Sequence, residues 1–389
     1  MRIIFDGRKL GDTGIGRYSA QLLQALLERF DDLEVVLLLQ DSRHSRERGN
    51  PQQTQRPPVH TGDLLLHPRV IPVQVSAKVF SVAEQLMFKQ LDRRYLPALI
   101  HVPHFNIPLF VDTPVISTIH DVIPLDFPQE LPGPLARFYY RHMNRLALSR
   151  SAAVIVPSQT TYTKVTTHFG PQAVPMHVIL EAPAADFVQD ERQVPWAKLQ
   201  QAHGLRQPYL LVVGLHKPHK QVALAIQLLK QLREHHGQSD LQLVLVGPSD
   251  PRYTPTLKKL GADAGLASVI HCISEIPADF LQPLFMHAAA LVFPSALEGF
   301  GLPILEAMAC GTPVLGFAQD SNREVGGTAM LLAPAYDVRA LARLAISVLD
   351  DTQKRSVVVA KGLAQASRFT WAQAAHATRD VYDAVQMQR

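Results

Sequence analysis

Cysteine is scarce in this chain, and long hydrophobic segments are missing from it. Only Cys272 and Cys310 occur among the 389 residues, which excludes a disulfide framework and favours a cytoplasmic compartment. The longest apolar runs, such as YLLVVG and AAALVF, are far shorter than the roughly 18 residues that a membrane span requires. The N-terminal sequence MRIIFDGRKLGD is typical of a strand and has no signal-peptide pattern.

Several signatures of catalysis, metal binding and nucleic-acid binding are also absent. The chain has no GxSxG nucleophile elbow. Two His-x-x-His pairs, His101 with His104 and His216 with His219, have no carboxylate cluster beside them, so we expect no metal site. The net charge of +4 is too small to indicate nucleic acid, but it is compatible with anionic ligands or an anionic membrane surface.

What the chain does have is a regular alternation of strand-like and helical segments. Short Val/Ile/Leu runs such as RIIFD, LEVVLLL, VIPVQV and AAVIVPS alternate with helical stretches over 15–29, 80–94, 134–149 and 159–168. After a polar stretch at 182–208 the alternation restarts with YLLVVG, LQLVLVG, SVIHCI and AALVFPS. Such runs indicate parallel strands buried on both faces. We therefore predict an α/β protein of two Rossmann-like, doubly wound domains that face a central cleft.

The polar stretch places the domain boundary near residue 190, giving domains over 1–190 and 191–370. Residues 42–63 lack apolar periodicity and are rich in Arg, Gln and Pro, which predicts a mobile surface insertion. A nucleic-acid-binding arm is the alternative for that segment.

The segment PSALEGFGLPILEAMACGTPV, residues 294–314, has the features of a phosphate site. Gly299 and Gly301 permit a tight turn between a buried strand and a helix. The backbone amides of Phe300, Gly301 and Leu302 would then lie at the helix entrance, at the positive end of the helix dipole.

Two carboxylates flank this turn. Glu298 precedes it, and Glu306 lies on the second helical turn. A carboxylate beside a phosphate site is best explained as an acceptor for ligand hydroxyl groups, because it would repel the phosphate. The alternative is that Glu298 is a loop residue and Glu306 a surface helix residue.

Three other segments follow predicted strands. VVGLHKPHKQ, residues 212–221, places several cationic groups at a strand end, and Lys220 could reach a diphosphate there, with His219 beside it. GDTGIGRYSAQLLQAL, residues 11–26, has an open helix entrance at Gly16; a lone Gly-x-Gly is a weak signal. Arg17 and Tyr18 could face a ligand there or could only cap and pack.

STIHDVIP, residues 117–124, ends a predicted strand with His120 and Asp121. The histidine could bind a ligand hydroxyl or phosphate. A structural pair at the strand end is the alternative.

These motifs together resemble the retaining glycosyltransferases of family 4, which have the GT-B fold. EGFGLPILEAMACGTPV resembles the family's Glu-x7-Glu signature, and GIGRY, IHDVIP, VPSQTT, KPHK, LVGP and FTWAQAA follow the family's order. The chain is most similar to bacterial enzymes of lipopolysaccharide, O-antigen or exopolysaccharide assembly, often mannosyltransferases.

The resemblance implies a role for each matching residue. Glu298 would hold hydroxyls of the donor sugar, and Glu306 the ribose. Lys220 and the amides of the 299–302 turn would hold the diphosphate, with Gly16 near it and His120 near the sugar. The chain departs from the family at Leu215, where an arginine is common, at Gln221, and at 180–182, where Leu-Glu-Ala replaces a frequent Asn-Gly.

The resemblance also implies partners and a mechanism. The donor would be a nucleoside-diphosphate sugar, GDP-mannose being favoured, and the acceptor a glycan or lipid-linked oligosaccharide bound on the N-terminal domain's side. Transfer would retain configuration by front-face substitution, without a metal or a cofactor. Helix 371–389 would pack back on the N-terminal domain. The protein would lie in the cytoplasm.

The helix predicted over 134–149 has basic and aromatic side chains at positions that could meet an anionic membrane surface. Arg137, Arg141 and Arg145 recur every four residues, hence on one face, and Phe138, Tyr139 and Tyr140 lie beside them. Such basic and aromatic helices are attracted by anionic lipid surfaces, which predicts peripheral contact with the inner membrane. An ordinary solvated helix packed on the sheet is the alternative.

Two other functions remain open on the sequence. The first is a nucleotide-sugar epimerase or a phosphorylase of similar architecture. The second is a non-catalytic sugar-nucleotide-binding protein, against which both glutamates and Lys220 argue.

Overall fold

The chain folds into two compact units. The computed structural model describes residues 1–10, 14–41, 61–190, 196–274, 276–277 and 280–388. Unit 1 comprises Met1–Glu181 and Thr370–Arg389, and unit 2 comprises Ala182–Phe369. The division falls earlier than the predicted boundary at 190, because Ala184 and Phe187 are buried in the core of unit 2.

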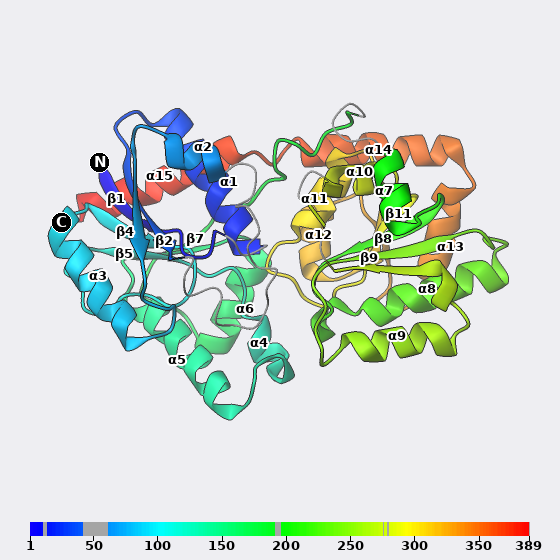
Figure 1. Ribbon diagram of the computed structural model, residues 1–389, viewed down its shortest axis with the longest axis horizontal. Coiled ribbons are helices and arrows are strands. Elements are labelled where there is room, and N and C mark those ends of the chain that lie inside the picture. Colours follow the sequence, from blue (N-terminus) through cyan, green and yellow to red (C-terminus); the bar gives the residue numbers. More distant parts are fainter. Residues whose placement is uncertain (11–13, 42–60, 191–195, 275, 278–279, 389) are drawn as a thin grey trace. The chain divides into compact units, whose positions relative to one another are not determined.

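Unit 1 is built on a seven-stranded sheet in the order β3-β2-β1-β4-β5-β6-β7, with every neighbouring pair parallel (Figure 1). The strands are β1 (Arg2–Asp6), β2 (Glu34–Gln40), β3 (Val70–Val75), β4 (Leu99–Val102), β5 (Val115–Thr118), β6 (Ala153–Val156) and β7 (Met176–Val178). The helices are α1 (Gly14–Arg29), α2 (Thr61–Leu66), α3 (Val82–Tyr95), α4 (Ile123–Asp126), α5 (Pro134–Arg150), α6 (Gln159–Phe169) and α15 (Trp371–Met387).

Both faces of this sheet are buried, as the apolar runs predict. In β1, Ile3 and Phe5 belong to one core cluster and Ile4 to another, because successive side chains point to opposite faces of a strand. The first cluster includes residues of α1 and α15, and the second includes residues of α3, α5 and α6. Helix α15 begins after the N-cap residue Thr370 and packs against α1.

Unit 2 has a six-stranded parallel sheet in the order β10-β9-β8-β11-β12-β13 (Figure 1). The strands are β8 (Tyr209–Val213), β9 (Gln242–Val246), β10 (Ile270–Ile273), β11 (Ala290–Phe293), β12 (Val314–Phe317) and β13 (Leu331–Ala333). The helices are α7 (Trp196–His203), α8 (Val222–His235), α9 (Thr254–Asp263), α10 (Leu281–Met286), α11 (Leu302–Ala309), α12 (Asp320–Gly326), α13 (Val338–Leu349) and α14 (Thr352–Ala366). The prediction of two doubly wound α/β domains is confirmed.

The strand order locates the edge of each sheet where ligands bind in such folds. In unit 1 the order reverses between β1 and β4, and in unit 2 between β8 and β11. Ligands of open α/β sheets bind outside the carboxyl ends of the strands at this reversal. The residues that follow β8 and β11, and those that follow β1, β4 and β5, are therefore the ones to compare with the predicted site.

Two segments differ from the sequence-based expectation. The predicted insertion ends within a helix, because α2 begins at Thr61, while residues 42–60 lie outside the described residues. The polar stretch 182–208 contains α7, whose Trp196 stacks on Tyr209 with ring centroids 5.6 Å apart. Leu199 of the same helix is fully buried in the core of unit 2, and the average composition of the polar stretch does not reveal these two contacts. No helix of the described ranges is long and apolar enough to cross a bilayer.

Candidate functional site

Lys220 and Glu298 form an ion pair at the reversal point of unit 2. Lys220 ends a 3-10 turn, Pro218–Lys220, after β8, and Glu298 lies in the loop after β11. The lysine Nζ is 2.7 Å from Glu298 Oε1 and 2.9 Å from Oε2. Both side chains are mostly buried, with exposed fractions of 17% and 9%. The structure thus brings together two residues predicted separately for the donor site.

The two loops that carry this pair are joined through their backbones. The amide of Ala296 donates to the carbonyl of His219 over 2.8 Å. His219 itself is buried, so its side chain is part of the support of this loop. Gln221 has a left-handed backbone conformation, with φ of 49°, and ends the turn before α8.

Glycines let the chain pass close to Lys220. A Cβ atom at Gly247 would lie 2.1 Å from the carbonyl oxygen of Gly214, and both glycines have φ near +145°. Substitution of Gly247 would therefore separate the loops after β8 and β9, and at Gly214 the backbone conformation itself favours glycine. The lysine side chain runs directly beside Gly214, where an added Cβ would contact Lys220 Cε at 3.4 Å.

The predicted helix entrance is present at α11. Gly301 precedes the helix with φ of +112°, a conformation that favours glycine, and Pro303 occupies the first turn. Phe300 is buried and packs near Phe369, with ring centroids 6.0 Å apart, so its side chain belongs to the core of unit 2. Gly299 and Leu302 are half-buried on either side of this turn.

Glu306 is fully buried, which excludes the interpretation as a solvated surface residue. Its charge acts on a neighbour: burial, together with Glu306 and Asp186, raises the pKa of the Cys310 thiol well above its usual range. A carboxylate held this deeply in an apolar helix costs stability, and such groups occur mainly where they have a function.

The histidine pairs have structural contacts. His101 bonds to Tyr382 over 2.6 Å and to Thr118 over 2.8 Å, while His104 Nε2 lies 3.0 Å from Asp6. His216 Nδ1 lies 3.0 Å from the Thr254 hydroxyl. In the part of the chain that the structure describes, no group of three or more His, Cys, Asp or Glu residues could hold a metal.

At the start of α1, Gly16 and Tyr18 are buried in the packing of unit 1. A Cβ atom at Gly16 would lie 2.4 Å from the Leu10 carbonyl oxygen, so the chain's own packing requires this glycine. Tyr18 is 3% exposed, and its hydroxyl lies 3.2 Å from that of Thr118. Desolvation raises the pKa of Tyr18 well above its usual range. Tyr18 thus packs inside the unit, which corrects its assignment as an acceptor contact, whereas Arg17 is half-buried on the first turn.

His120 and Asp121 follow β5 as predicted, and the histidine has a partner that sequence reasoning missed. His120 Nδ1 lies 3.3 Å from Glu181 Oε1, and Nε2 lies 3.2 Å from the Pro103 carbonyl oxygen. Asp121 accepts a hydrogen bond from the amide of Ile123, the first residue of the short helix α4, over 3.0 Å. The signal for Glu181 was the charged residue that stands where the family often has Asn-Gly.

A second cluster that the sequence did not reveal lies at the ends of β1 and β4. Arg8 donates to Asp6 over 2.6 Å and also bonds to Glu84 of α3, and all three side chains are buried. Asn106 donates to Glu84 over 2.7 Å. The signal here was a pair of opposite charges, Asp6 and Arg8, directly after a buried strand.

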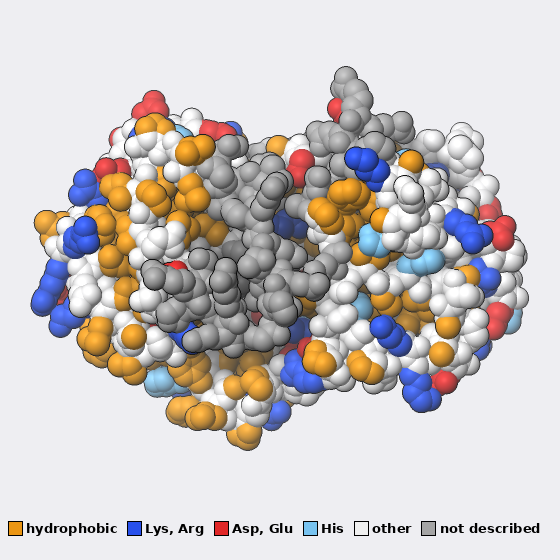
Figure 2. All heavy atoms as spheres, viewed as in Figure 1, with side chains coloured by type: hydrophobic (Ala, Val, Ile, Leu, Met, Phe, Trp, Pro, Cys, Tyr) orange, Lys and Arg blue, Asp and Glu red, His pale blue; other side chains and the backbone are white. Residues whose placement is uncertain are grey.

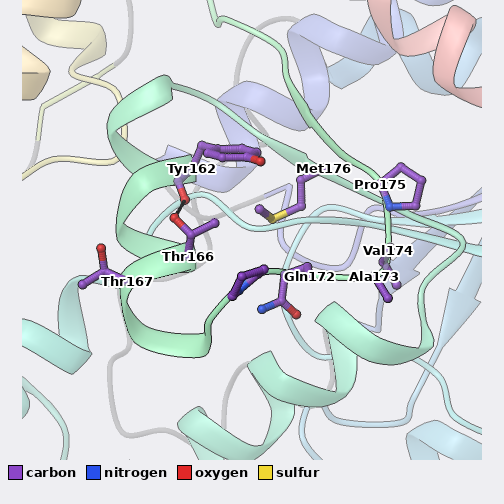
Figure 3. A pocket seen from close by; sticks show the side chains of 9 residues that line it. Tyr162, Thr166, Thr167, Gln172, Ala173, Val174, Pro175 and Met176 are labelled. Atoms are coloured by element: carbon purple, nitrogen blue, oxygen red, sulfur yellow. Dashed lines mark hydrogen bonds between the residues drawn. The ribbon is translucent and has the colours of Figure 1, made fainter.

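Two hollows of the described residues lie away from the Lys220–Glu298 pair and from His120. The pocket in Figure 3, about 520 Å³, is lined by neutral residues of α6 and of the segment that leads into β7, among them Tyr162, Gln172 and Met176. A second hollow of about 380 Å³ lies beside α9 and includes His216 and Cys272. Neither one includes Lys220, Glu298 or His120.

The two units match two domains of known proteins. Residues 13–181 match the family model described as Glycosyltransferase Family 4, and residues 197–364 match Glycosyl transferases group 1. The chain belongs to the glycosyltransferases of family 4. This result confirms the resemblance, and it does not favour an epimerase or a non-catalytic binding protein.

Relatives along the whole chain are similar to it at low identity. The O-antigen chain mannosyltransferase B of Escherichia coli is 27% identical over 98% of this chain and 99% of its own length. The O-antigen chain mannosyltransferase RfbU of Salmonella typhimurium is 24% identical over 79% of each chain.

Solved structures share the fold of this glycosyltransferase. Sucrose-phosphate synthase from Thermosynechococcus elongatus superposes with a TM-score of 0.76 at 19% identity, covering 100% of both chains. Anabaena HepE in complex with UDP and glucose superposes with a TM-score of 0.74 at 19% identity, covering 99% of this chain and 100% of its own. These likenesses establish the GT-B fold.

Proposed function

We propose that this glycosyltransferase transfers mannose from GDP-mannose to a growing glycan or lipid-linked oligosaccharide in cell-surface polysaccharide synthesis. The observation that carries the donor site is the Lys220–Glu298 pair at the carboxyl ends of two adjacent strands, β8 and β11. The choice of mannose is supported by the relatives that are named as O-antigen mannosyltransferases.

The ion pair suits a donor that carries both a diphosphate and a sugar. A carboxylate beside a diphosphate would repel it, and the lysine Nζ between them cancels that repulsion. Lys220 and the amides of the 299–302 turn bind the diphosphate, and Glu298 accepts hydrogen bonds from the sugar hydroxyls. Glu306, one helical turn further, binds the ribose.

The same groups supply what the reaction needs. Negative charge develops on the departing diphosphate in the transition state, and Lys220 stabilises it there. We propose that the configuration of the sugar is retained by attack on the face from which the diphosphate leaves, and that the departing phosphate takes the acceptor proton. The cationic groups of the protein take the place of a metal, and no cofactor is used.

Unit 1 contributes the remaining contacts in this proposal. His120 binds the transferred sugar or a phosphate oxygen, and Arg17 and Asp121 lie on the acceptor side. These residues follow strands or begin a helix at the reversal-point edge of the unit 1 sheet, where ligands of such folds bind.

A donor panel tests the proposal. The enzyme is incubated with GDP-mannose, GDP-fucose, UDP-glucose or UDP-galactose and a mannose-terminated acceptor, with and without EDTA. We expect release of GDP from GDP-mannose only when acceptor is present, unchanged by EDTA, and a product with retained anomeric configuration by NMR. Turnover restricted to UDP-sugars would contradict the donor assignment, and loss of turnover in EDTA would contradict metal independence.

We also propose that unit 1 contacts an anionic membrane surface. Arg137, Arg141 and Arg145 are exposed along α5, as predicted. Phe138 beside them is 68% exposed and Leu135 is 82% exposed.

The structure corrects the aromatic part of this surface. Tyr140 is buried, and Tyr139 is half-buried with its hydroxyl donating to Asn106, so Phe138 is the exposed aromatic residue of the three. Helix α3 contributes instead: Val82 and Leu86 are exposed near its start. Figure 2 shows hydrophobic side chains along the lower edge of unit 1, where Figure 1 places α3 and α5. A face of this composition attracts anionic lipid surfaces.

A further inference from the structure

Glu181 lies beside His120 because their strands are close neighbours in the sheet. His120 comes two residues after β5 and Glu181 three residues after β7, and β6 pairs with both strands in parallel. Parallel strands end at the same edge, so residues far apart in sequence meet there. The side chain of Glu181 is 7% exposed and that of His120 is 17% exposed. The contact is thus shielded from water, and its electrostatic effect is larger than at the surface.

Both ring nitrogens of His120 face oxygen atoms. Nδ1 lies 3.3 Å from Glu181 Oε1, and Nε2 lies 3.2 Å from the Pro103 carbonyl oxygen. A carbonyl oxygen only accepts hydrogen bonds, and so does an ionised carboxylate. Each contact therefore requires a proton on the nitrogen that it faces, and the arrangement favours the doubly protonated, positively charged ring.

The surroundings also restrict how the ring can turn. The Tyr18 ring packs edge-on against His120 with centroids 4.7 Å apart and an interplanar angle of 85°. The hydroxyl of Thr161 donates to the His120 carbonyl over 3.3 Å. Among the described residues, the titratable or charged groups around the ring include Glu181, Asp121 beside it in sequence, Tyr18 on α1, and His101 on β4. Burial and the nearby charge of His120 lower the pKa of His101 to about 3, so His101 remains neutral and does not compete for Glu181.

We propose that Glu181 is a positioning residue that holds His120 charged and oriented, so that the positive charge of the ring can stabilise a negatively charged oxygen of the donor. The inference rests on the proposed function, in which His120 binds the sugar or a phosphate oxygen. It assigns a role to the position where this chain has Glu181 and Ala182 in place of the family's Asn-Gly. An asparagine could orient the ring, but it would supply no negative charge to stabilise the cation.

The test compares Glu181→Gln and Glu181→Asp with the wild-type enzyme. Gln keeps an acceptor oxygen at nearly the same place and removes only the charge, whereas Asp keeps the charge on a shorter side chain. The matched control is Asp126→Asn, because Asp126 pairs with His168 at 3.0 Å on the same unit and takes no part in the proposed site. We measure kcat and KM for GDP-mannose and the pH dependence of kcat, and we record the imidazole 15N signals of His120, assigned with His120→Gln.

For Glu181→Gln we expect kcat to fall about tenfold or more, with KM for the donor nearly unchanged, as for other groups that orient a reacting residue. Activity should be lost with rising pH at a lower pH than in wild type, because the cation has lost its carboxylate. The 15N signals should show a larger share of doubly protonated ring in wild type than in the Gln variant when the two are compared at the same pH. Glu181→Asp should recover part of kcat, and Asp126→Asn should match wild type.

Other outcomes would overturn the role of Glu181, and they can be distinguished from a failure of the proposed function. An unchanged kcat and pH profile in Glu181→Gln, or a neutral His120 ring in wild type, would show that Glu181 has no such role. If wild type turns over no donor, the proposed function fails, while the 15N spectra still decide whether Glu181 holds the cation. If Glu181→Gln does not fold, the same decision rests on Glu181→Asp and on the wild-type 15N titration.

Discussion

Lys220 and Glu298 pair with each other, yet each has its own proposed contact with the donor: the lysine with the diphosphate and the glutamate with the sugar. The lysine Nζ donates a hydrogen bond to Glu298 Oε1 over 2.7 Å, so each charge has a partner within the fold. Removing one partner leaves a mostly buried charge behind, so each single variant has an effect on folding as well as on binding. Stability and nucleotide affinity must therefore be measured next to activity for every variant of this pair.

Lys220→Ala should lower kcat by about 10²-fold or more with any donor, because the charge is used most when the diphosphate leaves. Steady-state kinetics with saturating GDP-mannose measure this effect. Lys217→Ala is the matched control, since Lys217 lies in the same loop outside the ion pair, and it should retain most of kcat. A Lys220→Ala enzyme with nearly normal kcat would remove this residue from the mechanism.

Calorimetric titrations with GDP and GDP-mannose should give different results for the Gln variants of the two glutamates. Glu306→Gln should weaken both ligands alike, by on the order of 1.5–3 kcal/mol, because the ribose loses charge-assisted hydrogen bonds. Glu298→Gln should leave GDP binding nearly intact while transfer collapses. An equal loss of affinity for GDP in both variants would show that Glu298 contacts the nucleotide as well as the sugar.

At the scale of elements, a buried polar cluster ties together the segments that surround the carboxyl end of β1. Asp6 ends the strand, Arg8 follows it, Glu84 comes from α3 and His104 from the loop after β4. Burial by itself raises the pKa of Asp6, but Arg8 and His104 outweigh it and hold the pKa well below its usual range. The cluster fixes the loops at this edge of the sheet, next to the proposed acceptor residues.

Asp6→Asn should destabilise unit 1 by about 1.5–3 kcal/mol near neutral pH, because Arg8 and His104 lose a charged partner while Arg8 keeps its pair with Glu84. The folded-state pKa of Asp6 is lower than the unfolded value of about 3.9, so its contribution is present above pH ~4 and is lost as the pH falls further. Wild type and variant should therefore converge in strongly acidic solution. A difference that does not depend on pH would show that the carboxylate charge is not the cause.

Urea unfolding followed by tryptophan fluorescence measures this effect in one unit. The chain has two tryptophans, Trp196 in unit 2 and Trp371 in unit 1. In a Trp196→Phe background the signal reports unit 1 alone.

At the scale of the whole molecule, each unit is a complete doubly wound domain. The final helix returns the chain to unit 1, where Arg379 of α15 pairs with Asp32 over 2.7 Å and Gln386 donates to the Ala98 carbonyl over 2.6 Å. In unit 1, helices α3 and α5 both carry exposed basic and apolar side chains. Membrane contact is thus expected of unit 1.

Replacing Arg137, Arg141 and Arg145 together by Ala should reduce binding to anionic vesicles, since each basic residue near the surface contributes about 1 kcal/mol. Flotation with vesicles of phosphatidylglycerol and phosphatidylethanolamine measures the bound fraction. The control replaces Lys230, Lys259 and Arg339, exposed residues of unit 2, and removes the same charge. Equal binding of wild type and the α5 variant would show that α5 is an ordinary solvated helix.

The sequence by itself determined the elements and the local shape of the donor turn. Runs of Val, Ile and Leu specify parallel strands, and the glycine and proline at 301 and 303 specify the entrance of α11. These features depend on backbone conformation and on the periodicity of neighbouring residues, which a single stretch of chain contains.

Only the tertiary structure decided which side chains meet. Lys220 and Glu298 are 78 residues apart and His120 and Glu181 are 61 apart, and the periodicity of each segment contains no information on either pair. They meet because strand order places the ends of β8 and β11, and of β5 and β7, at common edges of their sheets. Burial then decides how strong the electrostatic interaction within each pair is, because a charge removed from water is stable only beside an opposite charge or a hydrogen-bond partner.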